Sequence, residues 1–263
     1  MIYIKTEEEI ELIKKSSLLV CETLAYLASL LKPGITTLEL DKLAEKFIRD
    51  HGGVPSFKGY HGYPFTLCTS VNDKVVHGFP SKEPLKEGDI VSIDCGVFLN
   101  GFHGDVAYTF AIGNVSDEAQ KLMKVTKEAL YKGIEQAVEG KRIGDIGYAI
   151  QSHAESNGFS VVRELVGHGL GKNLHEEPEV PNYGKRGHGV KLCEGMVIAI
   201  EPMVNFGSKK VKQLSDGWTI ATADGSLSAH YEHDVCVKKD KALILSDYTK
   251  IEENILKNEN IYG

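Results

Sequence analysis

An internal repeat constrains the fold of this chain more than any other feature of its sequence. Residues 85–94 align with residues 192–201, and both segments read Leu-x-Glu-Gly-x-hydrophobic-hydrophobic-Ser/Ala-Ile-acid. The helical patterns that end at Gly52 and Gly158 align at nearly the same offset. Because the two alignments agree, they predict two half-domains related by a pseudo-twofold axis, each with two helices followed by strands. The halves cover about 5–113 and 116–240.

Each copy of the repeat ends in a carboxylate, Asp94 in the first half and Glu201 in the second. Both acids follow apolar runs that are typical of buried strands, and burying a carboxylate without a partner is costly. Two such strands that meet across a pseudo-twofold axis bring their acids to one central point. A metal cation is the simplest partner for carboxylates that converge in this way.

The first of these strands continues into a β-hairpin. Asn100-Gly101 lies between two apolar runs, and this pair is a strong hairpin signal because both turn positions need a positive φ. A turn there places Gly96 opposite Asp105, so Asp94 and Asp105 become diagonal neighbours on one face, roughly 7 Å apart. Taken alone, the hairpin is equally consistent with a polar edge that carries two solvated aspartates.

Local patterns predict most of the other elements. Thr6 and Glu9 form a capping box before a helix that stops at Lys32-Pro33-Gly34, and Ser116 begins a third long helix. A fourth helix is expected over about Ile143 to Ser156. Apolar runs elsewhere predict strands. Those strands are expected over about 65–71, 75–77, 161–166, 196–200, 210–213, 219–223 and 232–238.

Composition excludes several classes of protein. The chain has 263 residues, of which 42% are apolar and 25% charged, as in ordinary soluble domains. The net charge of −7 comes without a long basic run, so nucleic acid is not expected as a partner. Five scattered cysteines contain no Cys-x-x-Cys pair, which fits a reducing cytosol. An acidic N-terminus and the lack of an apolar run of about 18 residues predict a cytoplasmic protein without a membrane partner.

Other segments could complete a metal site with the two acids of the repeat. His168 lies in Gly-His-Gly-Leu-Gly after a strand, and Glu232 begins the last predicted strand. Together with Asp94, Asp105 and Glu201 they make a hard, oxygen-rich set that suits Mn²⁺, Fe²⁺, Co²⁺ or Zn²⁺. Five ligands exceed the need of one ion, so two ions about 3.5–4 Å apart are expected. Such a pair is a hydrolytic arrangement that activates a bridging water.

Six segments resemble, in order and in spacing, the signatures of the type I methionine aminopeptidases. The resemblance extends from the first helix to about Lys238, and it implies the pita-bread fold of class α+β. In that fold, two pseudo-symmetric halves share a central curved antiparallel sheet covered by helices, here as one catalytic domain over residues 1–263. Only 26 positions separate His175 from Glu201, which leaves no room for the helical insertion of the type II enzymes. The six segments are residues 72–78, 102–105, 167–171, 175–178, 200–203 and 231–233.

The resemblance also implies how the five ligands divide between two divalent ions. Asp94 and Asp105 resemble the bidentate and bridging ligands, and Glu232 the second bridge. His168 and Glu201 would hold the other ion. Glu201 would also be the general base for the bridging water.

Further residues correspond to the family's substrate and cation sites. His77 and His175 resemble the histidines that contact the substrate and stabilise the oxyanion. An apolar pocket for the methionine thioether is expected next to them, with Leu174 where an aromatic residue is common. The expected wall of the pocket is Tyr60, Tyr63, Phe65, Cys68 and Trp218. A monovalent cation, Na⁺ or K⁺, is expected at Asn72, Lys74 and Ser228.

The implied function is removal of the N-terminal methionine from nascent proteins when the second residue is small and uncharged. A metal-bound hydroxide would attack the first peptide bond. Alternatives are a proline peptidase of the same fold, or a binding module that has lost catalysis. The chain is expected to be a monomer. Residues 209–212 are interpreted as a solvated hairpin edge, or as a ribosome-docking loop, and His103 and His233 could support the neighbouring ligands.

Overall fold

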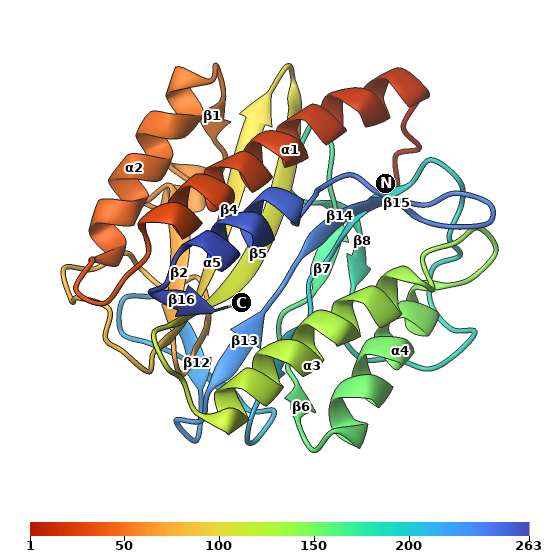
Figure 1. Ribbon diagram of the computed structural model, residues 1–263. Coiled ribbons are helices and arrows are strands. Elements are labelled where there is room, and N and C mark those ends of the chain that lie inside the picture. The colour runs from red at the N-terminus through yellow and green to blue at the C-terminus, as the bar shows by residue number, and fades with distance from the viewer. Residues whose placement is uncertain (263) are drawn as a thin grey trace.

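The computed structural model describes residues 1–262, and Figure 1 shows the helices gathered on one side of the strands. In that view α1, α2 and α5 lie over the strands of the first half, and α3 and α4 over those of the second. No helix in the described part of the chain is long and apolar enough to cross a membrane. The helices are α1 (Glu7–Leu30), α2 (Thr37–Asp50), α3 (Asp117–Ile134), α4 (Ile143–Ser156) and α5 (Thr249–Lys257).

The helices α1, α2 and α3 each begin where a side chain accepts a hydrogen bond from a free N–H group. Thr6 accepts a hydrogen bond from the N–H of Glu9, whose carboxylate accepts one from the N–H of Thr6, as the sequence predicted. Thr36 and Glu39 repeat this capping box at α2. The predictions for the starts of α1 and α3 and for both ends of α4 are confirmed.

Two five-stranded sheets form the centre of the molecule, and all of their strand pairs are antiparallel. The N–H of Glu232 donates to the carbonyl of Ala107 at 3.0 Å, which joins the two sheets. The first sheet contains β1 (Val54–Pro55), β2 (Leu67–Val71), β4 (Ile90–Leu99), β5 (Phe102–Ile112) and β16 (Ile261–Tyr262). The second contains β15 (Leu243–Ile244), β14 (His233–Cys236), β9 (Val197–Ile200), β7 (Gly167–Gly169) and β8 (Glu176–Val180).

Two three-stranded antiparallel sheets complete the strand layer, and together these elements make the α+β pita-bread fold. One holds β13 (Ser228–His230), β10 (Met203–Asn205) and β6 (Ser160–Val161). The other holds β11 (Val211–Gln213), β12 (Ile220–Thr222) and β3 (Lys74–Val76). A short 3-10 turn, η1 (Tyr60–Gly62), precedes β2.

The hairpin of β4 and β5 has the predicted register. Gly96 pairs with Asp105, and Asn100 and Gly101 form the turn with φ values of 54° and 86°. Alternate residues of β4, such as Val91 and Val97, enter the core beneath the helices. Asp94 therefore points to the opposite face, away from the helices.

The prediction of a strand over residues 161–166 is wrong. Only Ser160–Val161 pairs as a strand, in β6, and residues 162–166 run irregularly before β7 begins at Gly167. Their side chains do not follow an alternating pattern, because Arg163 and Glu164 interrupt the apolar residues. Residues 164–166 instead form part of the wall of a cavity.

Candidate active site

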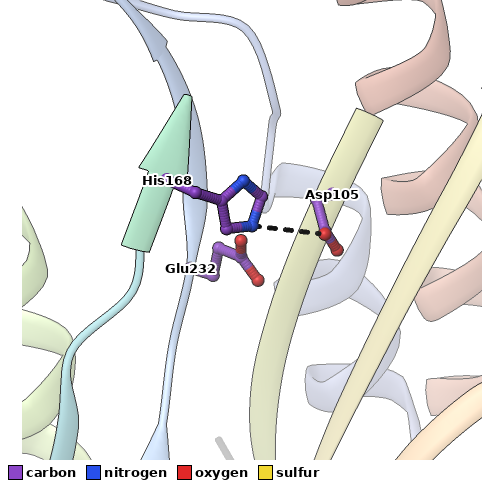
Figure 2. Close-up of side chains that lie close together, drawn as sticks. All are labelled: Asp105, His168 and Glu232. Atoms are coloured by element: carbon purple, nitrogen blue, oxygen red, sulfur yellow. Dashed lines mark ion pairs between the residues drawn. The ribbon is translucent and has the colours of Figure 1, made fainter. Parts of the chain in front are cut away.

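The acids predicted from the repeat and hairpin converge on one cavity of about 300 Å³. Asp94 and Asp105 come from the β4–β5 hairpin, while Glu201 follows β9 and Glu232 precedes β14. His168 enters from β7. Figure 2 shows Asp105, His168 and Glu232 pointing toward one another from three segments, and one ligand atom of each lies within 4.8 Å of the others.

His168 presents an unprotonated nitrogen to the acids. Its Nδ1 donates to the carbonyl of Gly169 at 2.9 Å, which leaves the lone pair on Nε2. That Nε2 lies 3.7 Å from Glu201 Oε1 and 3.9 Å from Asp105 Oδ2. Burial lowers the pKa of His168 to about 3, so the imidazole is neutral, as metal ligation requires.

The cavity leaves buried carboxylate oxygens without partners. Among the described residues, Asp94 Oδ1, Asp105 Oδ1 and Glu232 Oε1 are buried and accept no hydrogen bond. Burial raises the pKa of Asp94 to about 7 and that of Glu201 to about 8, and the pKa values of Asp105 and Glu232 also lie well above their usual range. A divalent cation would satisfy these oxygens and offset their mutual repulsion. The residues present therefore fit a divalent metal centre.

Two more histidines line the same cavity. His175 follows the β7–β8 turn, and its Nδ1 lies 2.7 Å from the hydroxyl of Tyr60. The ring of His175 is centred 4.2 Å from that of His168. His77 follows β3 with a φ of 58°, a strained backbone conformation of the kind that recurs at functional sites. Burial lowers the pKa of His77 to about 4, so His77 is a neutral donor near pH 7.

Aromatic and sulfur-containing side chains form an apolar wall beside the histidines. Four of the five predicted wall residues line the cavity: Tyr60, Tyr63, Cys68 and Trp218. The prediction is wrong for Phe65, which does not line the cavity and packs against Phe79 and Tyr63, with ring centres 5.2 and 6.2 Å away. Leu174, which the resemblance associated with the pocket, also lines the cavity, and so does Phe57, which was not predicted.

His230 is a buried residue of this region that the sequence analysis missed. Its Nε2 has no hydrogen-bond partner within residues 1–262 and lies 3.5 Å from Glu201 Oε2. Burial lowers the pKa of His230 to about 4. β13 ends at His230 and β14 begins at His233, so no single strand relates His230 to Glu232, and no signal in the sequence marks His230.

The two histidines that flank predicted ligands have other partners. His103 Nδ1 lies 2.9 Å from Ser56 Oγ, and His233 Nδ1 lies 2.6 Å from Ser246 Oγ. Asp105 is supported instead by Asp234, whose Oδ2 accepts a hydrogen bond from the Asp105 N–H at 2.8 Å. Sequence spacing alone could not reveal this contact, because the partners are 129 residues apart.

The residues expected at a monovalent-cation site lie on neighbouring segments. The N–H of Ser228 donates to the carbonyl of Asn72 at 2.9 Å, which brings these two positions together. The Asn72 side chain bridges Asp89 Oδ1 and the N–H of Ile90. Lys74 begins β3 and pairs with β12.

The family to which known proteins relate this chain is a metallopeptidase family, as the donor set of the cavity suggests. A model of metallopeptidase family M24 matches residues 11–239, and the fold and donor set together define a metal-dependent peptidase. The methionine aminopeptidase of Clostridium perfringens is 57% identical over 246 residues, which cover 94% of this chain and 99% of that protein. Methionine aminopeptidase 1 of Bacillus subtilis is 50% identical, with 90% and 96% covered. The chain belongs to the methionine aminopeptidases of metallopeptidase family M24.

Solved structures give the same result. The crystal structure of methionine aminopeptidase from Rickettsia prowazekii matches with a TM-score of 0.92 at 43% identity, covering 94% of this chain and 100% of that chain. The prolidase from Pyrococcus furiosus matches with a TM-score of 0.72 at 23% identity, covering 93% of this chain and 65% of that chain. The likeness to prolidase shows a shared fold alone.

Proposed function

We propose that this enzyme removes the N-terminal methionine from nascent polypeptides whose second residue is small and uncharged. The observation that carries the proposal is the set of buried carboxylates with unpartnered oxygens, in a cavity whose wall is aromatic and sulfur-containing. The names of the relatives agree with it, since each is a methionine aminopeptidase. One catalytic domain over residues 1–263, with pseudo-symmetric halves at about 5–113 and 116–240, is part of the same proposal.

Two divalent ions, of cobalt, manganese, iron or zinc, would occupy the cavity. Their chemistry is to lower the pKa of a shared water and to polarise the scissile carbonyl. The donor set supports this proposal because it is rich in oxygen and contains one imidazole, which is neutral. The proposed ligands are Asp94, Asp105, His168, Glu201 and Glu232.

The chain's own residues would bind, orient and move protons around the scissile bond. Glu201 would accept the proton of the attacking water, because bound cations would hold its side chain as a carboxylate beside that water. His175 and His77 would donate hydrogen bonds to the carbonyl oxygen as negative charge develops there. Their depressed pKa values keep both rings neutral, so each can carry one N–H for this purpose.

The apolar wall would bind the methionine side chain. A thioether makes favourable contacts with aromatic edges, and Tyr63 and Trp218 pack edge to face with ring centres 5.1 Å apart. The cavity of about 300 Å³ limits the space for the second residue, which favours a small one. The residues proposed to contact the side chain are Tyr60, Tyr63, Cys68 and Trp218.

Several finer features belong to the same proposal. A sodium or potassium ion would bind near Asn72, Lys74 and Ser228, because Asn72 and Ser228 are adjacent through their backbones. The enzyme would act as a monomer, and its five free cysteines support a location in the reducing cytoplasm. A transient ribosome contact would involve residues 209–212, where Lys209, Lys210 and Lys212 surround Val211.

Two substitutions test the proposed function. Glu201→Gln and Asp94→Asn should each lower kcat on a Met-Ala-Ser peptide by at least about 10²-fold with divalent metal supplied, because each removes a charged group from the reacting centre. His153→Gln is a control, since His153 hydrogen-bonds Glu128 on the helix side. Undiminished turnover in both test variants, or preferential cleavage of an Xaa-Pro peptide by the unmodified enzyme, would contradict the proposal.

A further inference from the structure

The N-terminal arm of the chain, residues 1–5, packs against the second sheet, whose residues lie more than 150 positions later in the sequence. The N–H of Lys5 donates to the carbonyl of Gly195 at 2.9 Å, and Ile2 forms a parallel bridge with Glu177 of β8. Gly195 permits this close approach, because a Cβ there would lie 2.8 Å from Ile4 Cγ2 and 3.0 Å from the Lys5 carbonyl oxygen. In Figure 1 the arm leaves the start of α1 and ends beside the strands of this sheet.

Lys5 of the arm forms a buried ion pair with Glu176, the first residue of β8. Lys5 Nζ lies 2.5 Å from Glu176 Oε2, and the two side chains are only 5% and 4% exposed. Removing one partner of such a pair leaves an uncompensated charge in the interior, which is strongly unfavourable. Lys5 therefore constrains the position of Glu176 far more than a surface lysine would.

Glu176 in turn closes the tight turn that connects β7 to β8. Its second oxygen, Oε1, accepts a hydrogen bond from the N–H of Asn173 at 3.1 Å. Gly171 begins this turn, and a Cβ there would lie 2.6 Å from Lys5 Cε and 2.9 Å from Glu176 Oε1, so a side chain at this position would displace the ion pair. The carbonyl of Gly171 accepts from the N–H of His103 at 2.8 Å, so the turn is also fixed to the β4–β5 hairpin.

The same turn presents His175 to the cavity. His175 is exposed at the cavity mouth, and its ring has one hydrogen-bond partner among the described residues, the hydroxyl of Tyr60. A side chain in that situation depends on its backbone for placement. The neighbouring residue, Glu176, supplies that constraint through the ion pair with Lys5.

We propose that Lys5 is a positioning residue for the peptidase reaction, because its buried ion pair with Glu176 fixes the turn that places His175 over the scissile carbonyl. This inference rests on the proposed function of His175. Errors of about 1 Å in the placement of such a group cost up to about 10²-fold in rate. Lys5 itself lies outside the cavity wall and acts only through the turn.

The test is Lys5→Met, which keeps the length of the side chain and removes its charge, made in the unmodified enzyme and in a His175→Ala background. In the unmodified enzyme, kcat on Met-Ala-Ser should fall about 10- to 100-fold while KM changes less than about threefold. In the His175→Ala background the same substitution should have almost no further effect, since the group that Lys5 positions is already absent. An equal fall in both backgrounds, or an unchanged kcat, would overturn the proposal.

Lys238→Met is the matched control, because it breaks another lysine–glutamate pair of 2.5 Å, with Glu7 at the start of α1. Its kcat should stay within about twofold of the unmodified enzyme. If Lys5→Met does not fold, the double variant Lys5→Met/Glu176→Gln is used instead in both backgrounds. It removes the buried charge that Lys5→Met alone leaves unpaired.

Hydrogen exchange separates this proposal from the proposed function. In Lys5→Met, the amide hydrogens of residues 171–176 should exchange at least about tenfold faster, whatever peptide the enzyme cleaves. A failure of the unmodified enzyme to cleave Met-Ala-Ser contradicts the proposed function alone. Unchanged exchange in this turn contradicts the role of Lys5.

Discussion

Burial determines the chemistry of the acids that converge in the cavity. Each of Asp94, Asp105, Glu201 and Glu232 has its pKa raised, with burial as the first cause, so the charged forms are disfavoured until a cation is present. The placement of Asp94 and Asp105 on one face of the hairpin was predictable, because an Asn-Gly turn fixes the register. The approach of His230 to Glu201 was not predicted, since no motif marks a histidine whose role comes from tertiary packing.

The raised pKa values predict how metal binding depends on pH. Ligation requires deprotonated carboxylates, so binding must release the protons held by groups whose pKa values are about 7 and 8. The apparent affinity for Mn²⁺ should therefore rise from about pH 6 to about pH 8.5, by roughly tenfold per pH unit for each proton released. Calorimetry in two buffers of different ionisation enthalpy measures the affinity for Mn²⁺ and the number of protons released on binding. A pH-independent affinity without proton release would contradict this explanation.

Exposure predicts the reactivity of the cysteines. Cys193 is exposed, whereas Cys21, Cys68, Cys95 and Cys236 are buried and their pKa values are raised by burial. The thiolate is the reactive form, so a water-soluble disulfide reagent should modify about one thiol in the native enzyme and five after denaturation. Cys193→Ser should abolish the native reaction. Rapid modification of that variant would show that the cavity wall at Cys68 is more open than the structure indicates.

Among the secondary-structure elements, the hairpin and α1 depend on each other most closely. Gly104 lies on the helix-facing side of β5, and a Cβ there would come within 2.3 Å of the backbone nitrogen of Ser17. Ser17 Oγ donates to Asp234 Oδ2 at 2.6 Å, and the same oxygen accepts from the N–H of Asp105. The contact between α1 and β5 therefore extends directly to a proposed metal ligand.

This contact predicts that Gly104→Ala destabilises the enzyme. The clash is with backbone atoms that cannot rotate away, so the free energy of unfolding should fall by about 1–3 kcal/mol, and metal affinity should fall with it. Gly133→Ala in α3 is the control, because its Cβ would meet side-chain atoms of Ile150 and Ile146 and no backbone atom, and alanine favours a helix. Urea titration of both variants measures the difference. Equal stability would contradict the tight packing of α1 on β5.

Elements with strong local signals were predictable, and those formed by tertiary contacts were not. Capping residues marked α1 and α3, and Asn-Gly marked the β4–β5 turn. In contrast, α5 has only nine residues and no side-chain cap, and it is held by contacts such as Asn254 Nδ2 to the carbonyl of Ala25 at 2.7 Å. Residues 162–166 were wrongly expected to be a strand. An apolar run suits a buried strand and the wall of a cavity equally well, so composition alone cannot distinguish the two.

At the scale of the whole molecule, the two sheets meet where the proposed metal ligands lie. Asp94 and Asp105 come from the first sheet, whereas His168, Glu201 and Glu232 come from within or beside the second. The two copies of the sequence repeat, residues 85–94 and 192–201, predict this meeting, because each copy ends in one of the acids. The N-terminal arm could not be placed in the same way, since nothing in the sequence near Lys5 points to Glu176.

The central claim is that this cavity holds the metal on which methionine removal depends. The most direct test is to strip the enzyme with a chelator, titrate it anaerobically with Mn²⁺ or Fe²⁺, and measure bound metal and Met-Ala-Ser hydrolysis in the same samples. Metal-free enzyme should be inactive, and activity should rise with metal to saturation, with up to about two ions bound per chain. Full hydrolysis by metal-free enzyme, or bound metal without any recovery of activity, would contradict the claim.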